Sequence, residues 1–530
     1  MARIYTGFRI TDTNLPALMS GNIPGIPFVQ RVALIGRDKT IIVERSAHAI
    51  IGIGWGDESK GQQTYNLCLR VRDLRPDNKP VLCCRFCDSS TSSGHRVYTL
   101  SGKDKVLNQL PAGMLVYGVT GVLAKLVNLE ALYNEIDRTE QHFNLKDLEN
   151  NFKIFEDTSI VFGYNVSSGR IKETHRRISL LDEYGSIGRG TGDAIEDKER
   201  GDNVTIKEVV DALSDTSKYK ELENKIKRIA KRKKEEAYAL MQDCPQAREH
   251  FDEKAFDVDS IFRKLIPLVE KLIKNRNIVK QDYIKRAFDE GASVIFEGSQ
   301  SPLLGKERGP YPYTVKTNTE ANQIETYSGI PLDQIEIIGV TRAYDSRHAY
   351  APFVPEITEK DLQGKITPEI YRKMLDSNPT GDNPFYGPFR AGWFDFLRLK
   401  HAIYLIESSG GKVGSIIVTN LDRLNGLDPS YACRSYKNGE EIYNQIPYNL
   451  DSSSFKDFLW GSTAVITPLK GWNINPRIVH DSKRSLAFRR LPDNVHNFFE
   501  EIQDETDGIP VSAGSIGIQP SNTLVNYGMR

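Results

Sequence analysis

The segment of residues 52–61 contains the residue types that phosphate chemistry needs. It reads Gly-Ile-Gly-Trp-Gly-Asp-Glu-Ser-Lys-Gly and overlaps the end of an apolar run. Glycines let backbone N–H groups approach phosphate oxygens, and the amino end of the helix expected near Gln62 adds a favourable dipole. Lys60 can balance anionic charge, and Asp57 can act as a base or bind magnesium. Because the chain contains no Walker A signature, we predict a phosphate-binding loop that is not an ordinary P-loop.

The elements around this loop alternate between strands and helices. Residues 47–54 form a short apolar run ending in glycines, as a buried strand does when it leads into a phosphate-binding turn. Further strands, with helical stretches such as 394–408 between them, are expected at residues 80–86, 292–296, 334–340 and 413–419. This alternation predicts an α/β fold with a mostly parallel central sheet. We expect one elaborated domain over residues 47–530, preceded by an extension over residues 1–46.

The region of about residues 205–290 is charged and helical in pattern. Leu222, Ile226 and Ile229 recur there at helical spacing among lysines, arginines and glutamates. One interpretation is an amphipathic helix that covers the core with its apolar face and leaves its charged face in solvent. The alternative is a basic arm that contacts nucleic acid or a partner.

The composition excludes several classes of protein. Lys plus Arg and Asp plus Glu both number 70, so the chain has no net charge and a general nucleic-acid-binding role is not expected. No apolar stretch approaches the roughly 20 residues of a membrane helix, and no secretory signal is recognised. The six cysteines include one CxxC pair, Cys84 and Cys87, without a second spaced pair for zinc. We therefore expect reduced thiols, no membrane association and a cytoplasmic location.

The loop sequence also has a family resemblance. GWGDESKG resembles the WGDEGKG signature of adenylosuccinate synthetase, and similar blocks follow in the family's order between about Ile51 and Val525. They are residues 92–95 (SSGH), 185–198 (GSIGRGTGDAIEDK), 296–304 (FEGSQSPLL), 311–313 (YPY), 318–319 (NT), 339–344 (GVTRAY), 347 (R), 351–353 (APF), 390–395 (RAGWFD), 419–422 (TNLD), 424–427 (LNGL), 515–518 (SIGI) and 523 (T). The resemblance implies the P-loop-NTPase-like adenylosuccinate-synthetase fold with helical insertions.

The resemblance implies a GTP- and Mg²⁺-dependent ligase. Such an enzyme phosphorylates the 6-oxygen of inosine monophosphate and replaces it with the amine of aspartate. Asp57 matches the base that removes the purine N1 proton, and His95 matches the acid that stabilises the transferring phosphoryl group. Gln300 matches a residue that supports Asp57 and the purine, and Lys60 belongs to the same catalytic loop. Asp57 and the Gly94 carbonyl match the magnesium ligands.

The nucleotide end of the family pattern is largely present. Asp422 falls where the family recognises guanine, because a carboxylate can accept from both N1–H and the 2-amino group. Asn420 stands where the family has a lysine along the base, and Ile518 stands where it has proline. The expected GTP contacts are Gly56, Glu58, Ser59, Gly61, Gly94, Asn420, Asp422, Ser515 and Gly517.

The purine-phosphate end departs from the family. An asparagine is replaced by Ser92 and two threonines by Ile187 and Val315, and neither apolar side chain can donate to a phosphate. The arginine that a neighbouring subunit contributes falls at Gly201, with Arg200 one position earlier. Arg189 is retained, and Thr314 and Lys316 are near enough in sequence to compensate. The expected purine-substrate contacts are Ser92, Ser186, Ile187, Arg189, Val315 and Lys316.

The amino-acid end departs as well. The family's arginine-rich loop reads Tyr-Gly-Pro-Phe-Arg-Ala-Gly-Trp over residues 386–393, and Arg390 alone remains of its arginines. Losing two bidentate arginine–carboxylate contacts weakens aspartate binding strongly unless other groups replace them. His348 stands where the family has valine and is a candidate contact of the amino-acid substrate.

These departures leave three interpretations open. The chain is an adenylosuccinate-type ligase with compensated binding, or a relative that uses another 6-oxopurine, such as a deoxynucleotide, a nucleoside or a base within a polymer. The third interpretation is a GTP-binding regulator that does not ligate. Family members are usually homodimers, so we expect a dimer whose partners are small-molecule purine and amino-acid substrates.

Overall fold

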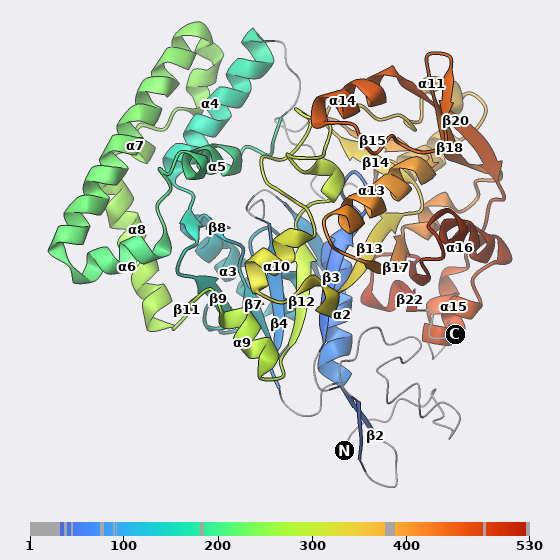
Figure 1. Ribbon diagram of the computed structural model, residues 1–530, viewed down its shortest axis with the longest axis horizontal. Helices are drawn as coiled ribbons and strands as arrows, with labels where there is room; N and C mark the ends of the chain where they lie inside the picture. Colours follow the sequence, from blue (N-terminus) through green and yellow to red (C-terminus); the bar gives the residue numbers. More distant parts are fainter. Residues whose placement is uncertain are drawn as a thin grey trace.

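The computed structural model describes residues 32–35, 40–43, 46–74, 79–87, 91, 93–180, 185–376, 387–480 and 484–525. The extension expected over residues 1–46 lies mostly outside these ranges. Its described part is an antiparallel hairpin of β1 (Val32–Ile35) and β2 (Thr40–Val43), which lies below the central sheet in Figure 1. The domain boundary at residue 46 therefore stays a prediction.

A ten-stranded sheet forms the centre of the molecule (Figure 1). Its order is β11-β9-β7-β4-β12-β3-β13-β17-β21-β22, and every neighbouring pair is parallel except β21 with β22. The predicted α/β fold with a mostly parallel sheet is confirmed. In chain order the strands are β3 (Ala47–Gly52), β4 (Val81–Phe86), β7 (Val119–Val122), β9 (Phe152–Phe155), β11 (Ile278–Val279), β12 (Ser293–Gly298), β13 (Glu336–Arg342), β17 (Val413–Thr419), β21 (Val511–Ser515) and β22 (Thr523–Val525).

The four central strands β4, β12, β3 and β13 are buried along their whole length. Successive side chains of a strand point to opposite faces of the sheet. In β4, Leu82 belongs to one apolar cluster together with Phe288, whereas Cys83 belongs to another together with Tyr65. Apolar cover therefore lies on both faces, which is what a parallel sheet requires and why these strands read as continuous apolar runs.

The helices lie mostly between successive strands of the chain. They are α2 (Lys60–Leu74), α3 (Leu129–Phe143), α4 (Gly163–Ser179), α5 (Thr191–Glu199), α6 (Ile206–Ser214), α7 (Thr216–Asp243), α8 (Val258–Lys274), α9 (Tyr283–Asp289), α10 (Asn322–Ser328), α11 (Glu359–Leu362), α12 (Pro368–Leu375), α13 (Phe396–Ser408), α14 (Ser452–Gly461), α15 (Arg484–Arg489) and α16 (Asp493–Glu505). Two boundaries differ from expectation. Helix α2 begins at Lys60 rather than near Gln62, and α13 begins at Phe396 because the Asp395 carboxylate caps it.

The charged region of about residues 205–290 forms a helical lobe with α4 and α5, on the left of Figure 1. Leu222, Ile226 and Ile229 of α7 are buried, as the amphipathic interpretation predicts. Helix α7 also buries Lys233, whose ammonium group contacts Asp193 of α5. Other cations of this helix pair with acidic groups of the same lobe: Lys225 with Glu208, Arg228 with Asp202 and Lys234 with Glu253. The apolar face of α7 and its ion pairs attach it to the rest of the lobe.

A second, four-stranded sheet lies on the other side of the molecule and was not anticipated from the sequence. It occupies the upper right of Figure 1 next to α14, and its strands are β16 (Phe394–Asp395), β18 (Ser430–Asn438), β19 (Glu441–Tyr443) and β20 (Ser462–Leu469). Three two-stranded pairs complete the described strands: β5 (His95–Tyr98) with β6 (Asp104–Leu107), β8 (Leu126–Val127) with β10 (Ser159–Ile160), and β14 (Asp345–His348) with β15 (Phe389–Gly392).

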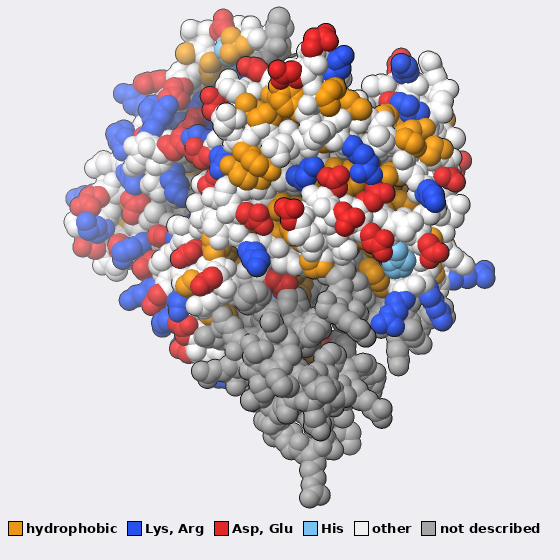
Figure 2. All heavy atoms as spheres, turned by 45° about the vertical axis from the view of Figure 1, so that its right-hand side comes forward, with side chains coloured by type: hydrophobic (Ala, Val, Ile, Leu, Met, Phe, Trp, Pro, Cys, Tyr) orange, Lys and Arg blue, Asp and Glu red, His pale blue; other side chains and the backbone are white. Residues whose placement is uncertain are grey.

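The surface and the thiols agree with the composition. Figure 2 shows Lys and Arg side chains interspersed with Asp and Glu over one face of the molecule. All six cysteines are free and buried, as the expected reduced thiols would be. In the described ranges, no helix combines the length and the hydropathy that a membrane span requires.

Candidate active site

A cavity of about 370 Å³ lies where the central parallel strands end. Open α/β sheets bind ligands outside the carboxyl ends of their strands, because loops from neighbouring strands meet there. Asp57 follows β3, Gln300 follows β12, Asn420 follows β17 and Gly517 follows β21, and all four line the cavity. The sheet therefore brings together residues that lie up to 460 positions apart in the sequence (57 to 517).

Glu58 holds the loop after β3 in shape. Its carboxylate accepts hydrogen bonds from the backbone N–H groups of Gly54, at 3.1 Å, and Gly56, at 2.9 Å, and from Nζ of Lys60 at 2.6 Å. A Cβ atom on Gly52 would lie 2.6 Å from a Glu58 carboxylate oxygen, which explains the glycine there. Burial opposes ionisation of Glu58, but Lys60 and the loop amides outweigh it, and the pKa of Glu58 is lowered.

The position of Glu58 changes its expected role. The resemblance placed it among the GTP contacts, but the side chain is 1% exposed and does not line the cavity. Gly56, Ser59, Lys60 and Gly61 of the same loop do line it. Glu58 thus shapes the loop from beneath, and the exposed edge of the loop remains free for phosphate oxygens.

The side chain of Asp57 contacts His348. Nε2 of His348 lies 2.8 Å from Oδ2 of Asp57, and Nε of Arg342 donates to the Asp57 carbonyl at 2.7 Å. Burial would raise the pKa of Asp57, but His348, Arg342 and Lys60 outweigh burial and bring the pKa to about 2. Asp57 is therefore ionised at neutral pH. His348, expected to contact the amino-acid substrate, instead contacts Asp57 in this structure.

His95 is held by a buried carboxylate. Its Nδ1 is hydrogen-bonded to Oε1 of Glu297, and Glu297 also accepts from the backbone N–H of Ala112 at 2.7 Å. Burial and the nearby Arg85 lower the pKa of His95 to about 4 even though Glu297 opposes the shift. Nε2 of His95 is buried and has no hydrogen-bond partner among the described residues, and the ring lines the cavity. This nitrogen is thus available to a ligand.

Three supporting residues were missed in the sequence. Glu297 orients His95, and the Arg342 side chain binds the Asp57 backbone. Arg85 is fully buried and donates to Oγ of Ser93 at 2.5 Å and to the carbonyl of Asn108 at 2.7 Å, so it supports the segment before His95. A signal was present for two of them, since Arg85 and Glu297 interrupt otherwise apolar buried strands, and a buried charge requires partners.

The nucleotide end gathers around the ends of β17 and β21. Asn420, Ser515 and Gly517 line the cavity, whereas Asp422 lies two residues further along and is not in the lining. Oδ1 of Asp422 is buried without a hydrogen-bond partner in the described part of the chain, and burial raises the pKa of Asp422. Buried carboxylate oxygens without partners are uncommon in folded proteins, and a ligand with two adjacent N–H groups would satisfy this one.

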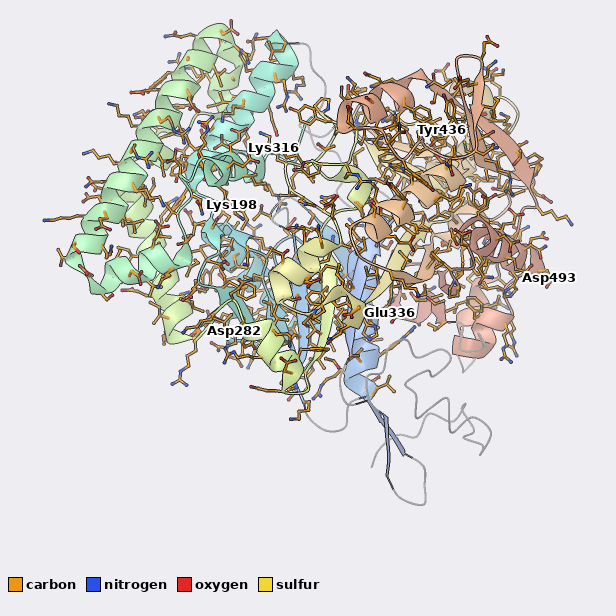
Figure 3. All side chains as sticks on the ribbon, viewed as in Figure 1. Lys198, Asp282, Lys316, Glu336, Tyr436 and Asp493 are labelled. Carbon is orange, nitrogen blue, oxygen red and sulfur yellow. The ribbon has the colours of Figure 1, made fainter. Side chains whose placement is uncertain are left out.

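The expected purine-substrate residues divide between two cavities. A second cavity of about 200 Å³ is lined by Ser186, Ile187, Val315 and Lys316, and it shares Ile187, Gln300 and His348 with the first. Lys316, which could have compensated for lost phosphate donors, pairs with Glu196 of α5. Figure 3 shows Lys316 near α5, at the upper end of the molecule, whereas Glu336 at the start of β13 lies toward the lower end.

Other expected purine contacts are placed differently. Arg189 lines the first cavity but not the second. Arg200 lies 3.6 Å from a Glu236 carboxylate oxygen, and Gly201 has open space around it. Ser92 lies outside the described residues. The second cavity therefore contains apolar side chains where the family pattern has phosphate donors.

Arg390 does not line either of these cavities. It lies on β15, and its guanidinium donates to Glu356 at 2.5 Å and to the carbonyls of Ala349 and Ala351, both at 2.7 Å. These bonds hold the turn that follows His348. In this conformation the one retained arginine of the expected amino-acid loop serves the protein itself, while the start of that loop, Tyr386, lies outside the described residues.

The donor set around Asp57 fits magnesium. Mg²⁺ prefers oxygen ligands and is usually bound by one or two carboxylates together with waters and substrate phosphates. Asp57 offers an ionised carboxylate, Gly94 offers a carbonyl, and both line the cavity. No cluster of three or more metal-ligating side chains occurs among the described residues, so phosphates and waters would have to complete the coordination.

Comparison with known proteins agrees with this geometry. The adenylosuccinate synthetase family model matches residues 49–524. Adenylosuccinate synthetases from Marinobacter nauticus and Thioalkalivibrio sulfidiphilus are 28% and 27% identical to the chain over 481 and 482 residues, which cover 90% of this chain and 97% of each relative. The structure of fully ligated adenylosuccinate synthetase from Plasmodium falciparum has a TM-score of 0.71 at 19% identity, covering 91% of this chain and 100% of that one.

The structural likeness shows that the fold is shared, and the family model extends over nearly the whole described domain, from β3 to β22. The predicted resemblance is thereby confirmed. This chain belongs to the adenylosuccinate synthetase family of ligases.

Proposed function

We propose that the chain is a GTP-dependent carbon–nitrogen ligase that exchanges the 6-oxygen of a purine for an amine. One observation carries the proposal: the ends of neighbouring strands bring an ionised Asp57, a His95 ring nitrogen without a partner and Gln300 to one cavity. Phosphoryl transfer to a 6-oxopurine requires a base, an acid and an amide that supports the purine, all lining the same cavity.

In the proposed first step Asp57 takes the N1 proton of the 6-oxopurine, which makes the 6-oxygen nucleophilic. That oxygen attacks the γ-phosphorus of GTP, the bond to the bridging oxygen breaks, and GDP leaves. In the second step the amine nitrogen attacks C6 and loses a proton, and the 6-oxygen leaves with the phosphoryl group as inorganic phosphate. Phosphorylation is needed because an unmodified 6-oxygen is a poor leaving group.

The chain supplies positioning and charge for these steps. Glu297 fixes Nδ1 of His95, so that Nε2 is the nitrogen that meets the transferring phosphoryl group. An anionic phosphate beside Nε2 favours the protonated imidazole, which then donates to it. Glu58 holds the loop in shape through the amides of Gly54 and Gly56, and the opposite, exposed edge of the loop faces the phosphates. When bound by Asp57 and the Gly94 carbonyl, Mg²⁺ would neutralise charge on the phosphates.

Asp422 supports GTP as the phosphoryl donor. Its unpartnered buried oxygen can accept from guanine, which presents N1–H and the 2-amino group side by side. Adenine offers no such pair of donors. By analogy with the family we further propose a homodimer that binds magnesium.

For the substrates we propose an inosine-monophosphate-like purine and an aspartate-like amine. A second candidate is a different 6-oxopurine with a different amine. It is favoured by Ile187 and Val315 in the second cavity and by the internal contacts of Lys316 and Arg390. A regulator that only binds GTP would not need the retained residues Asp57, Gly94, His95 and Gln300.

The test is phosphate release from GTP with Mg²⁺, measured with and without each substrate, with the purine product identified by mass spectrometry. The expected result is release that needs both a purine and an amine, with a product whose mass is that of the purine plus the amine minus one water. A panel of inosine monophosphate, guanosine monophosphate, their deoxy forms and inosine separates the two substrate proposals. GTP binding without release under every purine and amine would contradict the ligase.

A further inference from the structure

The second cavity contains a buried acceptor that the protein itself does not satisfy. Glu173 lies on α4 and lines this cavity. Its Oε2 atom is buried and has no hydrogen-bond partner in the part of the chain that the structure describes. Buried side-chain oxygens without a partner are uncommon in folded proteins. The cavity thus has a place for a donor that a ligand can supply.

The lysines that line the second cavity are committed to other carboxylates. Lys172 pairs with Asp193 at 2.6 Å and with Glu196 at 2.8 Å. Lys316 also pairs with Glu196. The cavity therefore offers an unused acceptor while both of its lysines already have partners. This arrangement favours a ligand that donates a hydrogen bond over a ligand that brings a negative charge.

The electrostatic surroundings of Glu173 agree with a missing donor. Burial raises the pKa of its carboxyl, and hydrogen bonds from Ser186 together with the charges of Arg176 and Lys316 oppose that shift only in part. A hydroxyl that donated to Oε2 would stabilise the ionised carboxylate, because hydrogen bonds to a charged acceptor are stronger than those between neutral groups.

The two cavities meet where the substituent of a bound purine would pass. Ile187, Gln300 and His348 line both of them. In the proposed reaction the purine ring lies beside Asp57 and Gln300. The large substituent of a purine in nucleosides and nucleotides is the sugar on N9, so the sugar would extend past Gln300 into the second cavity.

The walls of the second cavity suit the carbon face of a sugar. Apolar side chains line it, namely Ile187, Ile195, Leu304 and Val315. Such side chains can contact the C–H groups of ribose but cannot accept from its hydroxyl groups. Among the described lining residues, the buried oxygen without a partner is Oε2 of Glu173. A sugar placed there would therefore find one acceptor within largely apolar walls.

We propose that Glu173 determines the sugar specificity of the enzyme, because its Oε2 accepts a hydrogen bond from a ribose hydroxyl of the purine substrate. The substrate class is then a riboside rather than its deoxy form. The proposal rests on the purine-binding part of the proposed function. A deoxy substrate would leave the buried carboxylate oxygen without a donor, and a site built to bond a hydroxyl discriminates strongly against the analogue that lacks it.

The test measures equilibrium binding to the full chain by calorimetry, without GTP or amine. The probes are inosine monophosphate and its 2′-deoxy and 3′-deoxy forms. We compare the wild type with Glu173→Ala and Glu173→Gln. The matched control is Glu235→Ala on α7, which removes a carboxylate that is 67% exposed.

We expect the wild type to bind one of the two deoxy forms about ten-fold or more weakly than inosine monophosphate. In Glu173→Ala this difference should disappear, because the ribose form loses affinity and the deoxy form does not. Glu173→Gln, which keeps an uncharged acceptor, should retain part of the difference, and Glu235→Ala should retain all of it. The substitution and the loss of the hydroxyl remove the same bond, so their effects should not add.

Three results would overturn the proposal. They are equal wild-type affinity for the three probes, no binding of any of them, and an equal loss of affinity for ribose and deoxy forms in Glu173→Ala, which would mean that Glu173 only shapes the cavity. Because the assay contains no GTP, a chain that discriminates in this way but never releases phosphate would contradict the ligase and leave the hydroxyl site standing. A ligase that binds ribose and deoxy forms equally would contradict the role of Glu173 alone.

Discussion

At the scale of single residues, the contact between His348 and Asp57 sets the basicity of the carboxylate that we propose as the base. Nε2 of His348 lies 2.8 Å from Oδ2 of Asp57, at a position where the family pattern has valine. A carboxylate with a pKa of about 2 is always ready to accept a proton near neutral pH, but it accepts one weakly. The chain therefore places beside the proposed base a neighbour that lowers the basicity of its carboxylate.

The first prediction concerns this pair. In His348→Val the partner that lowers the pKa of Asp57 is gone, so that pKa rises. Activity needs ionised Asp57 and is lost as the pH falls through its pKa, so the acidic limb of the pH profile should move to higher pH. The measurement is kcat/KM for phosphate release between about pH 3 and 8, a range in which wild-type Asp57 stays ionised and the variant should show a new acidic limb. His348→Gln, which keeps a hydrogen-bond donor, should shift the limb less, and an unchanged limb in His348→Val would contradict the role of the contact.

A second residue-scale prediction separates function from packing at His95. Glu297→Gln keeps a buried acceptor near Nδ1 but removes the charge that favours protonated His95. Phosphate release should fall by about ten- to hundred-fold, with GTP affinity nearly unchanged. The measurement is steady-state kinetics beside equilibrium GTP binding.

The matched control for Glu297→Gln is Glu336→Gln. Oε2 of Glu336 lies 2.9 Å from Nδ1 of His48, so this is another buried Glu–His pair. It lies at the start of β13, at the opposite end of the sheet from the cavity (Figure 3). Both variants should lose stability, and Glu297→Gln alone should lose activity. Equal loss of activity in the two would mean that Glu297 matters only for folding.

At the scale of elements, helix α7 is held to α5 through a buried cation. Lys233 lies between Asp193 and Asp197, and α5 also carries Glu196, which pairs with Lys316 at the second cavity. A charge run that is typical of a solvated surface thus contains one residue that positions a wall of the second cavity. The helical periodicity of α7 was visible in the sequence, but the burial of Lys233 was not, because lysine is usually exposed.

The third prediction tests this attachment. Lys233→Ala removes the buried cation that lies between Asp193 and Asp197. Because these carboxylates keep Lys172 and Arg232 as partners, the loss should destabilise the fold by about 2 kcal/mol. Lys231→Ala on the same helix removes a side chain that is 77% exposed and should change little. Denaturant unfolding of both variants measures the difference, and equal midpoints would show that the buried pair does not hold the helix.

The fourth prediction concerns the ion pairs between α5 and the second cavity. Burial opposes ionisation of Glu196, but Lys172 and Lys316 outweigh it and lower its pKa from 4.5 to about 2. A lowered pKa contributes stability that is present above pH 4.5 and is lost as the pH falls toward 2. Melting temperatures over this range should fall less steeply in Glu196→Gln than in the wild type or in Glu270→Gln, an exposed control on α8. A parallel fall in all three would exclude this contribution.

At the scale of the whole molecule, one cavity joins the two halves of the sheet. Its lining comes from segments that follow β3, β4, β12, β13, β17 and β21, so a ligand there contacts elements from most of the chain. A ligand that binds the folded state and not the unfolded chain stabilises the whole fold in proportion to its affinity.

The fifth prediction follows from that linkage. GTP with Mg²⁺ should raise the melting temperature, by an amount that corresponds to about 2.7 kcal/mol at a concentration 100 times Kd. ATP should raise it less, because Asp422 has no pair of donors to bind on adenine. In Asp422→Asn the difference between GTP and ATP should disappear, since a neutral amide cannot accept two hydrogen bonds in the same way. Equal shifts with both nucleotides in the wild type would remove Asp422 from guanine recognition.

The sequence alone determined the fold class and the identity of the central loop. Apolar runs that end in glycine, separated by helical patterns, predict a parallel sheet because periodicity is a local property of the chain. The order of the family blocks likewise predicted which residues meet at the cavity, and Asp57, His95 and Gln300 do meet there. The second sheet was missed because its main strands, β18 and β20, mix polar and apolar residues and lack the continuous apolar runs of the central strands.

The tertiary structure decided which partner each charged side chain has. Glu58 turns beneath the loop, His348 contacts Asp57, and Arg390 bonds to its own turn. These contacts join residues up to nearly 300 positions apart, such as Asp57 and His348. They depend on which side chains are buried next to one another when the chain folds. A charged residue in a sequence shows that a partner is needed, but the packing of distant strands and loops selects which one.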